Sequence, residues 1–587
     1  MGAEFSGEQT RWLEGFASGA AALRSLAKAA PGAVALPGAV PSGPDAGQLA
    51  AQDRTLKGGG KLSDQEKWKR SEHPHDAYAR LKADAGAGRY PKPDDNFRWR
   101  YHGLFYVAPA QPNFMARLRI AGGILKHWQL AALATLTERC GAGHCDITTR
   151  ANLQVREISA VHGPAFLEGA AEIGLIPRGA GSDNVRNITG SAGAGIDPQE
   201  LLDTRAHASA MHHHILNSRA LSGLPRKFNI AFDGAGSVAT LEETNDIGFQ
   251  AVEVLSGPLA GIRYRLALGG ISGHQDLARD TGVIVAPEDA VNVADAVLRV
   301  FIDSGDRTNR AKARLKYVLD DWGFERFLAA VEEKLGRKLD RIDAALVAPR
   351  AAPDRLAHIG VHAQKQPGLS RVGVAVRAGR LTAAQMRLLA AIARQAGDGD
   401  LRLTVWQNLL VSGVPDSKLD DVKANLAAAG LDWRVSNIRA GLVACTGSRG
   451  CKFANADTKG DSLAIADQLE ARLTLDQPLN IHLTGCPNSC AQHYIGDIGL
   501  IGVKVTVNDA GDQVAGYDIV AGGGYGAQAK IGAPVFSGVK SQDAPAHVES
   551  LLRAFTAHRL SPQESFQAFT ARHDGAALRA LASGAMA

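Results

Sequence analysis

Two stretches of the sequence, about 250 residues apart, are related to each other, and this restricts the chain to folds built from two similar halves. Residues 228–252 (FNIAFDGAGSVATLEETNDIGFQAV) align without a gap with residues 479–503 (LNIHLTGCPNSCAQHYIGDIGLIGV). The matching positions are Asn229/Asn480, Ile230/Ile481, Gly234/Gly485, Asp246/Asp497, Ile247/Ile498, Gly248/Gly499 and Val252/Val503. A repeat of this length is too long for a solenoid unit. We therefore expect a duplicated module whose halves fold alike and pack about a pseudo-twofold axis.

Further matches occur in the same order along both halves. TTRANL (148–153) corresponds to TVWQNL (404–409), and NVRN (184–187) corresponds to NIRA (437–440). In each half, strand-like runs such as NLQVREI or RVGVAVRAG alternate with Ala- and Leu-rich runs such as HWQLAALATLTERC or AAQMRLLAAIARQ. Strand–helix–strand units predict an α+β protein with α/β-type units.

Only the second copy contains clustered cysteines. Cys445 and Cys451 form a C-x5-C pair, and Cys486 and Cys490 form a C-x3-C pair 34 residues further on. Both pairs lie among Gly, Pro, Asn and Ser, whose tight turns allow several sulfur atoms to converge. Two close pairs of thiolates are typical of an iron–sulfur cluster.

Two other uses of cysteine compete with this interpretation. Structural zinc also takes four cysteines, but its knuckles favour two to four residues within a pair, so C-x5-C fits poorly. A disulfide framework is disfavoured because six cysteines are too sparse in 587 residues. We therefore favour the iron–sulfur cluster and keep zinc as the alternative.

The first copy has alanines, Ala235 and Ala239, where the second has Cys486 and Cys490. It carries basic residues instead, and across a pseudo-twofold axis these would form a cationic wall facing the metal. Such a wall suits an anionic substrate or cofactor, although any one arginine taken alone is more often a solvated surface charge. The basic residues are Arg117, Arg119, Arg150, Arg156, Arg186, Arg226 and Lys227.

Two further groups of potential ligands are incomplete. Cys140 and Cys145, with His144 between them, provide too few ligands for a metal site, and we interpret them as ordinary reduced thiols. The MHHH run at residues 211–214 is interpreted as histidines on a helix surface, because consecutive helical residues point in different directions.

Composition excludes several classes of protein. The net charge is only +5 and no dense Lys/Arg block is present, so we expect no nucleic-acid partner. No window approaches 18 uninterrupted apolar residues and the N-terminus lacks a secretory signal, so we expect neither a membrane span nor export. Sparse cysteines in such a chain indicate the reducing cytoplasm.

The N-terminal region differs from the rest of the chain. Residues 8–28 have the spacing of an amphipathic helix, and residues 29–60 are rich in Ala, Gly and Pro and read as a linker. We expect the ordered body to begin near Lys61.

The cysteine motifs CTGSRGC and TGCPNSC, together with LPRKFN (224–229), RLRIAGG (117–123) and NVRN (184–187), resemble the ferredoxin-dependent nitrite and sulfite reductases. The resemblance runs from about Lys61 to the C-terminus. It implies a duplicated fold in which each half consists of a ferredoxin-like half-domain and a larger α/β domain. The expected units are 1–60 (helix and linker), 61–177 (N-terminal arm and first ferredoxin-like half-domain), 178–351 (first α/β domain), 352–435 (second ferredoxin-like half-domain) and 436–587 (second α/β domain).

The resemblance also implies two cofactors, a [4Fe–4S] cluster and a sirohaem. Cys445, Cys451, Cys486 and Cys490 would bind the cluster, and Cys490 would also bridge to the sirohaem iron. The substrate residues implied on the open haem face are Arg119, Arg186, Lys227 and Asn229. Those implied for the sirohaem carboxylates are Arg117, Arg150, Arg310 and Lys316, and Arg314 is a further candidate.

The implied reaction is the assimilatory reduction of nitrite to ammonium by six electrons. Sulfite-reducing relatives usually carry a second lysine two places after the PRK lysine, and here that residue is Asn229. One fewer cation suits the monoanion nitrite better than dianionic sulfite. Sulfite reductase on the same scaffold is the alternative, followed by precorrin-3B synthase and a non-catalytic electron carrier.

The electron donor is expected to be a separate protein. No GxGxxG motif lies in a clear βαβ context, and the glycines of VAGGGYG (520–526) read as a duplicated turn matching LALGGISG (266–273). We therefore expect an acidic ferredoxin or flavodoxin as donor, nitrite or sulfite as substrate, and a monomeric enzyme.

Overall fold

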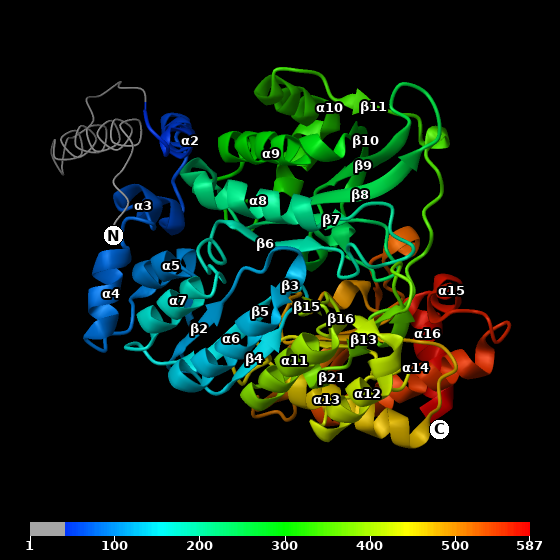
Figure 1. Cartoon of the computed structure of the whole chain (residues 1–587). Coiled ribbons are helices and arrows are strands. Elements are labelled where there is room, and N and C mark those ends of the chain that lie inside the picture. The colour runs from blue at the N-terminus through cyan, green and yellow to red at the C-terminus, as the bar shows by residue number, and fades with distance from the viewer. Residues whose placement is uncertain (1–40, 587) are drawn as a thin grey trace, which may run out of the picture.

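The computed structural model describes residues 41–586, in which two halves repeat the same order of sheets and helices (Figure 1). The helix expected over residues 8–28 lies outside the described residues. From residue 41 onward, four helices precede the first sheet, namely α2 (Ala46–Lys57), α3 (Asp64–Ser71), α4 (Tyr78–Gly86) and α5 (Pro93–Tyr101). No helix among residues 41–586 is long and apolar enough to cross a membrane.

Helix α2 corrects one expectation from the sequence. Residues 46–57 were predicted to belong to a linker, but they form a helix whose buried side chains are Gln48, Ala51 and Gln52. The Gln52 side chain donates to the Glu66 carboxylate on α3 over 2.8 Å. The linker prediction was wrong here because the buried face of this helix consists of alanine and glutamine side chains. Residues of these types are not recognised as core residues from composition alone.

Two antiparallel sheets of five strands form the ferredoxin-like layer. The first sheet has the order β1–β2–β5–β4–β14 and the second has the order β12–β13–β16–β15–β3. The first comprises β1 (Leu104–Tyr106), β2 (Phe114–Arg117), β5 (Leu153–Ile158), β4 (His144–Ile147) and β14 (Arg380–Thr382). The second comprises β12 (Gly360–Ala363), β13 (Leu369–Val374), β16 (Leu409–Pro415), β15 (Asp400–Leu403) and β3 (Ile124–Lys126).

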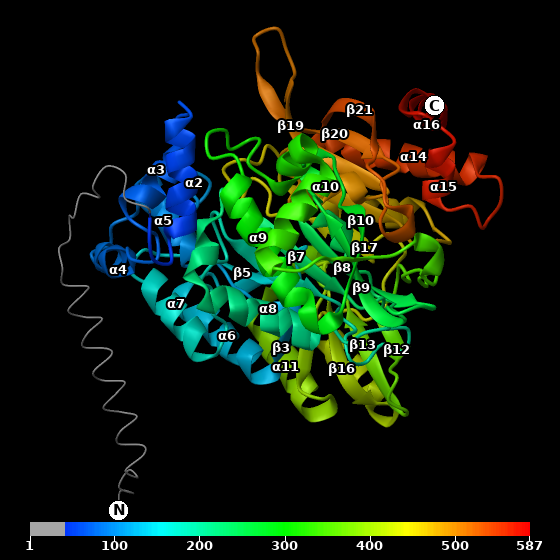
Figure 2. The ribbon, with the colours of Figure 1, turned by 90° about the horizontal axis from the view of Figure 1, so that it is seen from above.

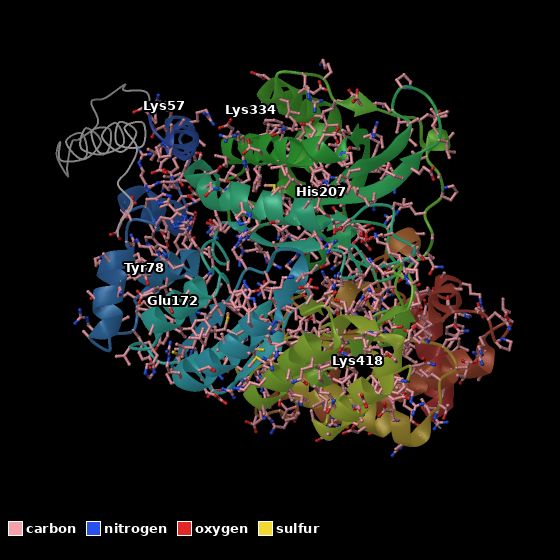
Figure 3. The ribbon with its side chains drawn as sticks, in the orientation of Figure 1. Lys57, Tyr78, Glu172, His207, Lys334 and Lys418 are labelled. Carbon is pink, nitrogen blue, oxygen red and sulfur yellow. The ribbon has the colours of Figure 1, made fainter. Side chains whose placement is uncertain are left out.

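Helices cover these two sheets and join them into one unit. The covering helices are α6 (His127–Cys140), α7 (Gly163–Glu172), α11 (Ala383–Ala396) and α12 (Leu419–Ala428). Tyr78 on α4 and Glu172 on α7 mark two neighbouring helices in Figure 3. Helices α6 and α11 pack against each other, and the buried apolar residues of both sheets form a single cluster.

The halves exchange edge strands. Strand β14 of the second half pairs with β4 of the first, with Leu381 opposite Cys145. Strand β3 of the first half pairs in turn with β15 of the second, with Leu125 opposite Leu401. Neither sheet is complete without a strand from the other half, so the two halves are fixed relative to each other.

Each half also contains a larger mixed sheet. The first has the order β11–β10–β9–β8–β7–β6, and the second has the order β17–β18–β19–β20–β21. The strands of the first are β6 (Val185–Gly190), β7 (Phe228–Asp233), β8 (Ile247–Val254), β9 (Gly261–Leu268), β10 (Arg279–Val285) and β11 (Asp340–Arg341). Those of the second are β17 (Gly441–Ala444), β18 (Asn480–Thr484), β19 (Ile498–Thr506), β20 (Gln513–Ala521) and β21 (Ala533–Lys540).

In both larger sheets, three parallel strands are followed by antiparallel ones, and helices cover the apolar faces. The hairpin formed by β19 and β20 projects from the body (Figure 2). The helices that accompany the larger sheet of the first half are α8 (Arg205–Asn217), α9 (Ala290–Ser304) and α10 (Leu315–Leu335). Those of the second half are α13 (Thr458–Arg472), α14 (Ala544–His558), α15 (Phe566–Ala571) and α16 (Gly575–Met586).

Equivalent hydrogen bonds recur in the two halves and confirm the predicted duplication. The Asn229 backbone N–H donates to the Asp246 carboxylate over 2.8 Å, and that of Asn480 donates to Asp497 over 2.7 Å. The glycine turns also correspond, because the N–H of Gly269 and that of Gly522 each donate to the carbonyl of the matching aspartate over 2.9 Å. The α+β class with duplicated halves is therefore confirmed.

The strand exchange predicts that a cavity in β14 destabilises both halves together. Leu381 is fully buried between the halves, so Leu381→Ala should lower the free energy of unfolding by about 2–5 kcal/mol. Urea denaturation followed by circular dichroism measures this change. The control is Leu560→Ala, which alters a leucine that is 78% exposed and should leave the transition unchanged. A separate early transition of one half in Leu381→Ala would contradict the shared core.

Candidate active site

The two cysteine pairs come together because they follow neighbouring parallel strands. Cys445 directly follows β17, and Cys486 follows β18 with one glycine between. Since β17 and β18 pair in parallel, their carboxyl ends lie at the same edge of the sheet. The Cys445 N–H donates to the Leu483 carbonyl over 3.0 Å, which ties the first pair to the end of β18.

The thiols are surrounded by donors and by one another. The Gly485 N–H donates to the Cys445 sulfur over 3.2 Å, and the Asn488 amide donates to the Cys486 sulfur over 3.5 Å. Burial, and then the Cys490 and Cys451 thiolates, raise the pKa of Cys486 to about 11. Burial and the Cys490 thiolate also raise the pKa of Cys445. Without a metal, burial thus favours the neutral thiols at these two positions, and a bound metal centre would lower both pKa values again by stabilising the thiolates.

The spacing and bonding state of the cysteines help to decide which kind of metal centre they would bind. All six cysteines lie among the described residues and none forms a disulfide. Within residues 41–586, no three Cys, His, Asp or Glu side chains converge as ligands of a single ion. The C-x5-C spacing of the first pair disfavours the zinc alternative, and two close pairs of cysteines suit an iron–sulfur cluster.

Five basic residues form a cluster that begins near Cys490 and is called the cationic pocket below: Arg117, Arg150, Arg186, Arg226 and Lys227. Arg117 ends β2, Arg150 lies in the turn after β4, Arg186 lies on β6, and the other two directly precede β7. Each is half-buried.

The charges of this pocket have no carboxylate in direct contact, and Asp183 and Asp246 act on some of them only from further away. Within the described part of the chain, none of the five residues forms an ion pair with a carboxylate, so they are held by neutral groups. Arg186 donates to the carbonyls of Ala180 (3.0 Å) and Ser182 (2.7 Å), and Arg117 lies 4.6 Å from the centroid of the Phe105 ring. The pocket therefore keeps its positive charge for an anionic ligand.

The pKa shifts reflect this excess of positive charge. Burial, together with neighbouring cations, lowers the pKa of Arg117, Arg150 and Arg226 to about 10 each. The same causes lower the pKa of Arg186 and Lys227 well below their ordinary values. A negative charge on Cys490 would raise the pKa of Arg117, Arg150 and Lys227, so these three side chains lie within electrostatic range of Cys490.

Asn229, whose backbone is bound by Asp246, lies at the edge of the pocket next to Lys227. Asn229 follows Lys227 by two residues, so alternation along the extended chain directs both side chains to the same side. The Asp246 carboxylate accepts from the Asn229 backbone and from Arg314, whose guanidinium donates over 2.7 Å. Arg150 donates to the side-chain oxygen of the adjacent Asn245.

Three of the basic residues predicted for the site do not join the pocket. Arg119 is buried elsewhere, where it donates to the Val185 carbonyl over 2.6 Å, because β2 ends at Arg117 and the chain leaves the sheet. Arg310 forms a bidentate ion pair with Asp183 at 2.9 and 2.7 Å. The Lys316 amine lies 2.8 Å from Asp276 and 2.6 Å from Asp320.

Two contacts that orient the site were not predicted from the sequence. The Thr149 hydroxyl donates to the Cys490 carbonyl over 3.0 Å, which brings the turn bearing Arg150 against the cysteine loop. The Gln407 side chain exchanges hydrogen bonds of 2.9 Å with the backbone of Ala444, just before Cys445. These two residues lie in the matching segments TTRANL and TVWQNL, and that match was the available signal.

The corresponding place in the first half is filled with apolar side chains. Trp406, which occupies the position of Arg150 in the repeat, packs there with Val238 and Leu241. Ala357, from the segment between the halves, completes the filling, and His358 beside it stacks on Trp406 at 5.6 Å. The duplicated fold therefore offers one cationic pocket rather than two.

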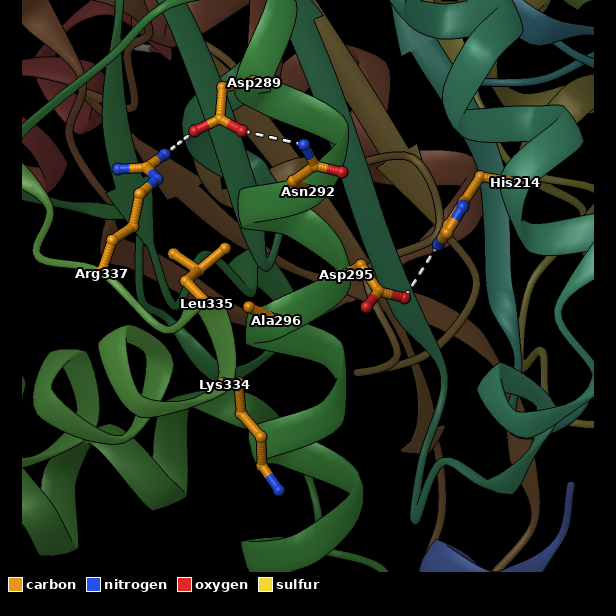
Figure 4. A pocket seen from close by; sticks show the side chains of 8 residues that line it. All are labelled: His214, Asp289, Asn292, Asp295, Ala296, Lys334, Leu335 and Arg337. Carbon is orange, nitrogen blue, oxygen red and sulfur yellow. Dashed lines mark hydrogen bonds and ion pairs between the residues drawn. The ribbon is translucent and has the colours of Figure 1, made fainter. Parts of the chain in front are cut away.

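Neither of the remaining candidate groups resembles a site. His212 contacts Arg119, whereas His214 lies 2.8 Å from Asp295 at a surface pocket of about 300 Å³ on α8, α9 and α10 (Figure 4). In that pocket Arg337 and Asn292 are both paired with Asp289. The histidines point in different directions, as predicted, but His212 is buried rather than on the surface.

Cys140 and Cys145 are both buried in the core of the ferredoxin-like layer. The Cys145 sulfur lies 3.3 Å from the sulfur of Met386, so this thiol packs as an apolar side chain.

Comparison with known protein families gives two matches that together cover more than half of the chain. Residues 181–339 and 435–565 match the nitrite and sulphite reductase 4Fe-4S domain. Residues 108–173 and 362–429 match the nitrite/sulfite reductase ferredoxin-like half domain. Each family occurs twice, once in each half.

Individual proteins agree with the family matches. The ferredoxin–nitrite reductase of Synechococcus elongatus is 39% identical over 468 residues, which cover 78% of this chain and 89% of that protein. The assimilatory ferredoxin-dependent nitrite reductase of Haloferax mediterranei is 32% identical over 533 residues, covering 85% and 90%. The structure of the NirA protein of Mycobacterium tuberculosis superposes with a TM-score of 0.82 at 31% identity, covering 89% of this chain and 99% of that one.

The geometry of the cysteine site predicts which thiols retain iron. Cys451→Ser should remove most of the iron and acid-labile sulfide, about four of each per chain in the wild-type protein, because one ligand of the centre is lost. Cys140→Ala, which alters a buried thiol of the ferredoxin-like layer, should leave both contents unchanged. Colorimetric iron and sulfide analysis of the purified proteins measures the difference, and full iron content in Cys451→Ser would contradict the assignment.

Proposed function

This chain belongs to the nitrite and sulfite reductase family, and on that premise we propose that it reduces nitrite to ammonium with electrons from a reduced ferredoxin. The observation that carries the proposal is the uncompensated cationic pocket beside Cys490 of the four-cysteine site. Nitrite is favoured over sulfite because similar proteins from cyanobacteria and archaea are named nitrite reductases. The neutral side chain of Asn229 also suits a monoanion.

The residues present fit both cofactors of the family. Cys445, Cys451, Cys486 and Cys490 would hold the [4Fe–4S] cluster, because the two pairs follow the neighbouring parallel strands β17 and β18 within a segment that matches the 4Fe-4S domain. Arg117 and Arg150 would bind sirohaem carboxylates next to Cys490, which would also ligate the sirohaem iron. Bound sirohaem supplies an iron that binds nitrite and delivers the electrons collected by the cluster.

The remaining pocket residues would position the substrate. We assign Arg186, Lys227 and Asn229 to the nitrite oxygens, since the two cations have no competing carboxylate and the amide can donate without adding charge. The family motif implied that Arg119 contacts the substrate. We propose instead that Arg119 positions Arg186, because its guanidinium donates to the carbonyl of the adjacent Val185. Arg117 replaces Arg119 as the arginine of this segment that faces the pocket.

The same cations would supply protons to the substrate oxygens and stabilise the negative charge that develops there. Conversion of nitrite to ammonium and two waters consumes six electrons and eight protons, so the pocket must deliver protons to oxygens that leave as water. Burial and the neighbouring arginines lower the pKa of Lys227, so its Nζ gives up a proton more readily than an ordinary lysine. Arg186 stays charged and stabilises negative charge that develops on the oxygens.

Two finer features belong to the same proposal. The chain itself provides both the cysteines and the cationic pocket, so we propose that it acts as a monomer. The six cysteines are few for this chain length and none forms a disulfide, and we propose a cytoplasmic location on this ground.

The role of Lys227 is tested by a matched pair of lysine variants. Lys227→Gln should lower kcat/KM for nitrite about 100-fold or more, because an unpaired cation that contacts the substrate is removed. Lys316→Gln should retain most of the activity, because Lys316 is already paired with Asp276 and Asp320. Both variants should keep the iron and sirohaem content of the wild type. Equal kinetics for Lys227→Gln and the wild type would remove Lys227 from the proposed site.

Sulfite is the second candidate substrate, because the same cations would bind it. Purified enzyme supplied with dithionite-reduced methyl viologen should show a higher kcat/KM for nitrite than for sulfite. Asn229→Lys should shift the ratio towards sulfite, because a further cation favours the dianion. A higher kcat/KM for sulfite in the wild type would identify a sulfite reductase.

A further inference from the structure

An arginine from the first half holds the loop that carries Cys445 and Cys451. Arg156 lies on β5 of the first ferredoxin-like sheet and is 4% exposed. Its guanidinium donates to the Gly450 carbonyl over 2.9 Å and to the Thr446 hydroxyl over 2.6 Å. Thr446 directly follows Cys445 and Gly450 directly precedes Cys451, so the arginine bridges the two ends of the loop between these cysteines.

The fit between this arginine and the loop is close. A Cβ atom at Gly450 would lie only 2.8 Å from Nη1 of Arg156 and 2.9 Å from the methyl carbon of Thr446. The glycine therefore allows the guanidinium to lie directly against the backbone of the loop. A side chain at position 450 would push the arginine away from the loop.

The charges around this contact sum to an excess of positive charge. Asp146 is buried and lies 3.3 Å from the Arg156 guanidinium, 2.9 Å from Arg380 and 3.6 Å from Lys459. Lys459 follows Thr458, whose hydroxyl donates to the Cys445 carbonyl over 2.8 Å. Three cations thus share a single carboxylate next to the cysteine loop.

The other charged pair at this loop contributes little. Arg449 forms an ion pair with Asp457 at 2.6 Å, and its side chain is 80% exposed, so the two charges cancel and solvent screens them. Because Arg156 and Asp146 are buried and the Lys459 side chain is only 12% exposed, their field acts through a medium of low polarity and is screened less.

A buried positive charge favours reduction of a cluster held by four thiolates. Such a [4Fe–4S] centre carries two negative charges when oxidised and three when reduced, since reduction adds one electron and no proton. Net charge and hydrogen bonding around the sulfur ligands set its potential. An arginine keeps its charge at every accessible pH, so its effect does not depend on titration.

We propose that Arg156 is a positioning residue that fixes the Cys445–Cys451 loop and raises the reduction potential of the cluster bound there. The raised potential favours transfer of one electron from a reduced one-electron donor protein, which is oxidised by one electron in the same step. This inference rests on the proposed function only for the presence of the cluster. It assigns a role in electron entry to the first half of the chain, which carries none of the four cysteines.

The test is a redox titration of the holoprotein, with the reduced cluster followed by EPR. Arg156→Gln should shift the midpoint potential to more negative values, because a buried positive charge is lost. Asp146→Asn should shift it to more positive values, because the only buried carboxylate of the group is lost. Both changes break the same network, so a purely structural effect would move the two potentials in the same direction. Shifts of the same sign, or no shift in Arg156→Gln, would overturn the proposal.

Two further variants separate charge from positioning. Arg156→Lys keeps the charge but not the paired bonds to Thr446 and Gly450, so its potential should stay nearer the wild type than that of Arg156→Gln. Its cluster should be lost faster in the presence of an iron chelator. Arg380→Gln removes a cation that pairs with Asp146 but is 43% exposed, and it should give a smaller negative shift. A larger shift in Arg380→Gln than in Arg156→Gln would contradict the assignment.

Failure of the proposed function is distinguishable from failure of this inference. A wild-type protein that contains the cluster but does not reduce nitrite would refute the function, and opposite shifts in the two variants would still support the role of Arg156. If Arg156→Gln loses its cluster, the positive shift of Asp146→Asn and the chelator sensitivity of Arg156→Lys remain decisive. Absence of both effects would refute the proposal.

Discussion

The exchange of edge strands between the halves is the constraint on which the site depends. Strand β14 completes the first ferredoxin-like sheet and β3 completes the second, so one apolar cluster spans both. This fixed relation lets residues of the first half reach the cysteine loops of the second. Thr149 contacts the carbonyl of Cys490, and Arg156 contacts the loop between Cys445 and Cys451. Without this fixed relation, the cysteines and the cationic pocket would be separate, incomplete sites.

The two halves of the duplicated fold contribute different chemical groups to the site. The second half provides four cysteines in two close pairs, and the first half provides five cations that form no ion pair with a carboxylate of the described residues. The cations are unfavourable alone, because buried charge requires a partner of opposite sign. A polyanionic cofactor would satisfy the cations, and a metal centre would be bound by the cysteines as thiolates. The second possible pocket is closed by Trp406 and Ala357, so the fold contains only one such combination among its described residues.

Much of this arrangement could be predicted from the sequence, because motifs and repeats record local constraints. The four cysteines and the duplication were identified by residue type and spacing, whereas the roles of Arg186 and Lys227 were implied by the family resemblance. The distinction between Arg117 and Arg119 was not predictable, because it depends on β2 ending at Arg117. Likewise, Arg310 and Lys316 resemble free cations in the sequence, and only the fold brings them next to Asp183 and Asp276. Helix α2 was missed because its buried face is made of Gln48, Ala51 and Gln52.

The central claim is that nitrite binds in the first-half pocket at a haem iron linked through Cys490 to the cluster. The most direct measurement is the EPR and visible spectrum of the purified holoprotein before and after addition of nitrite. The account predicts a ferric sirohaem signal that nitrite changes, and a cluster signal on reduction that is coupled to the haem. A haem spectrum unaffected by saturating nitrite, or a protein that binds the cluster without sirohaem, would contradict the account.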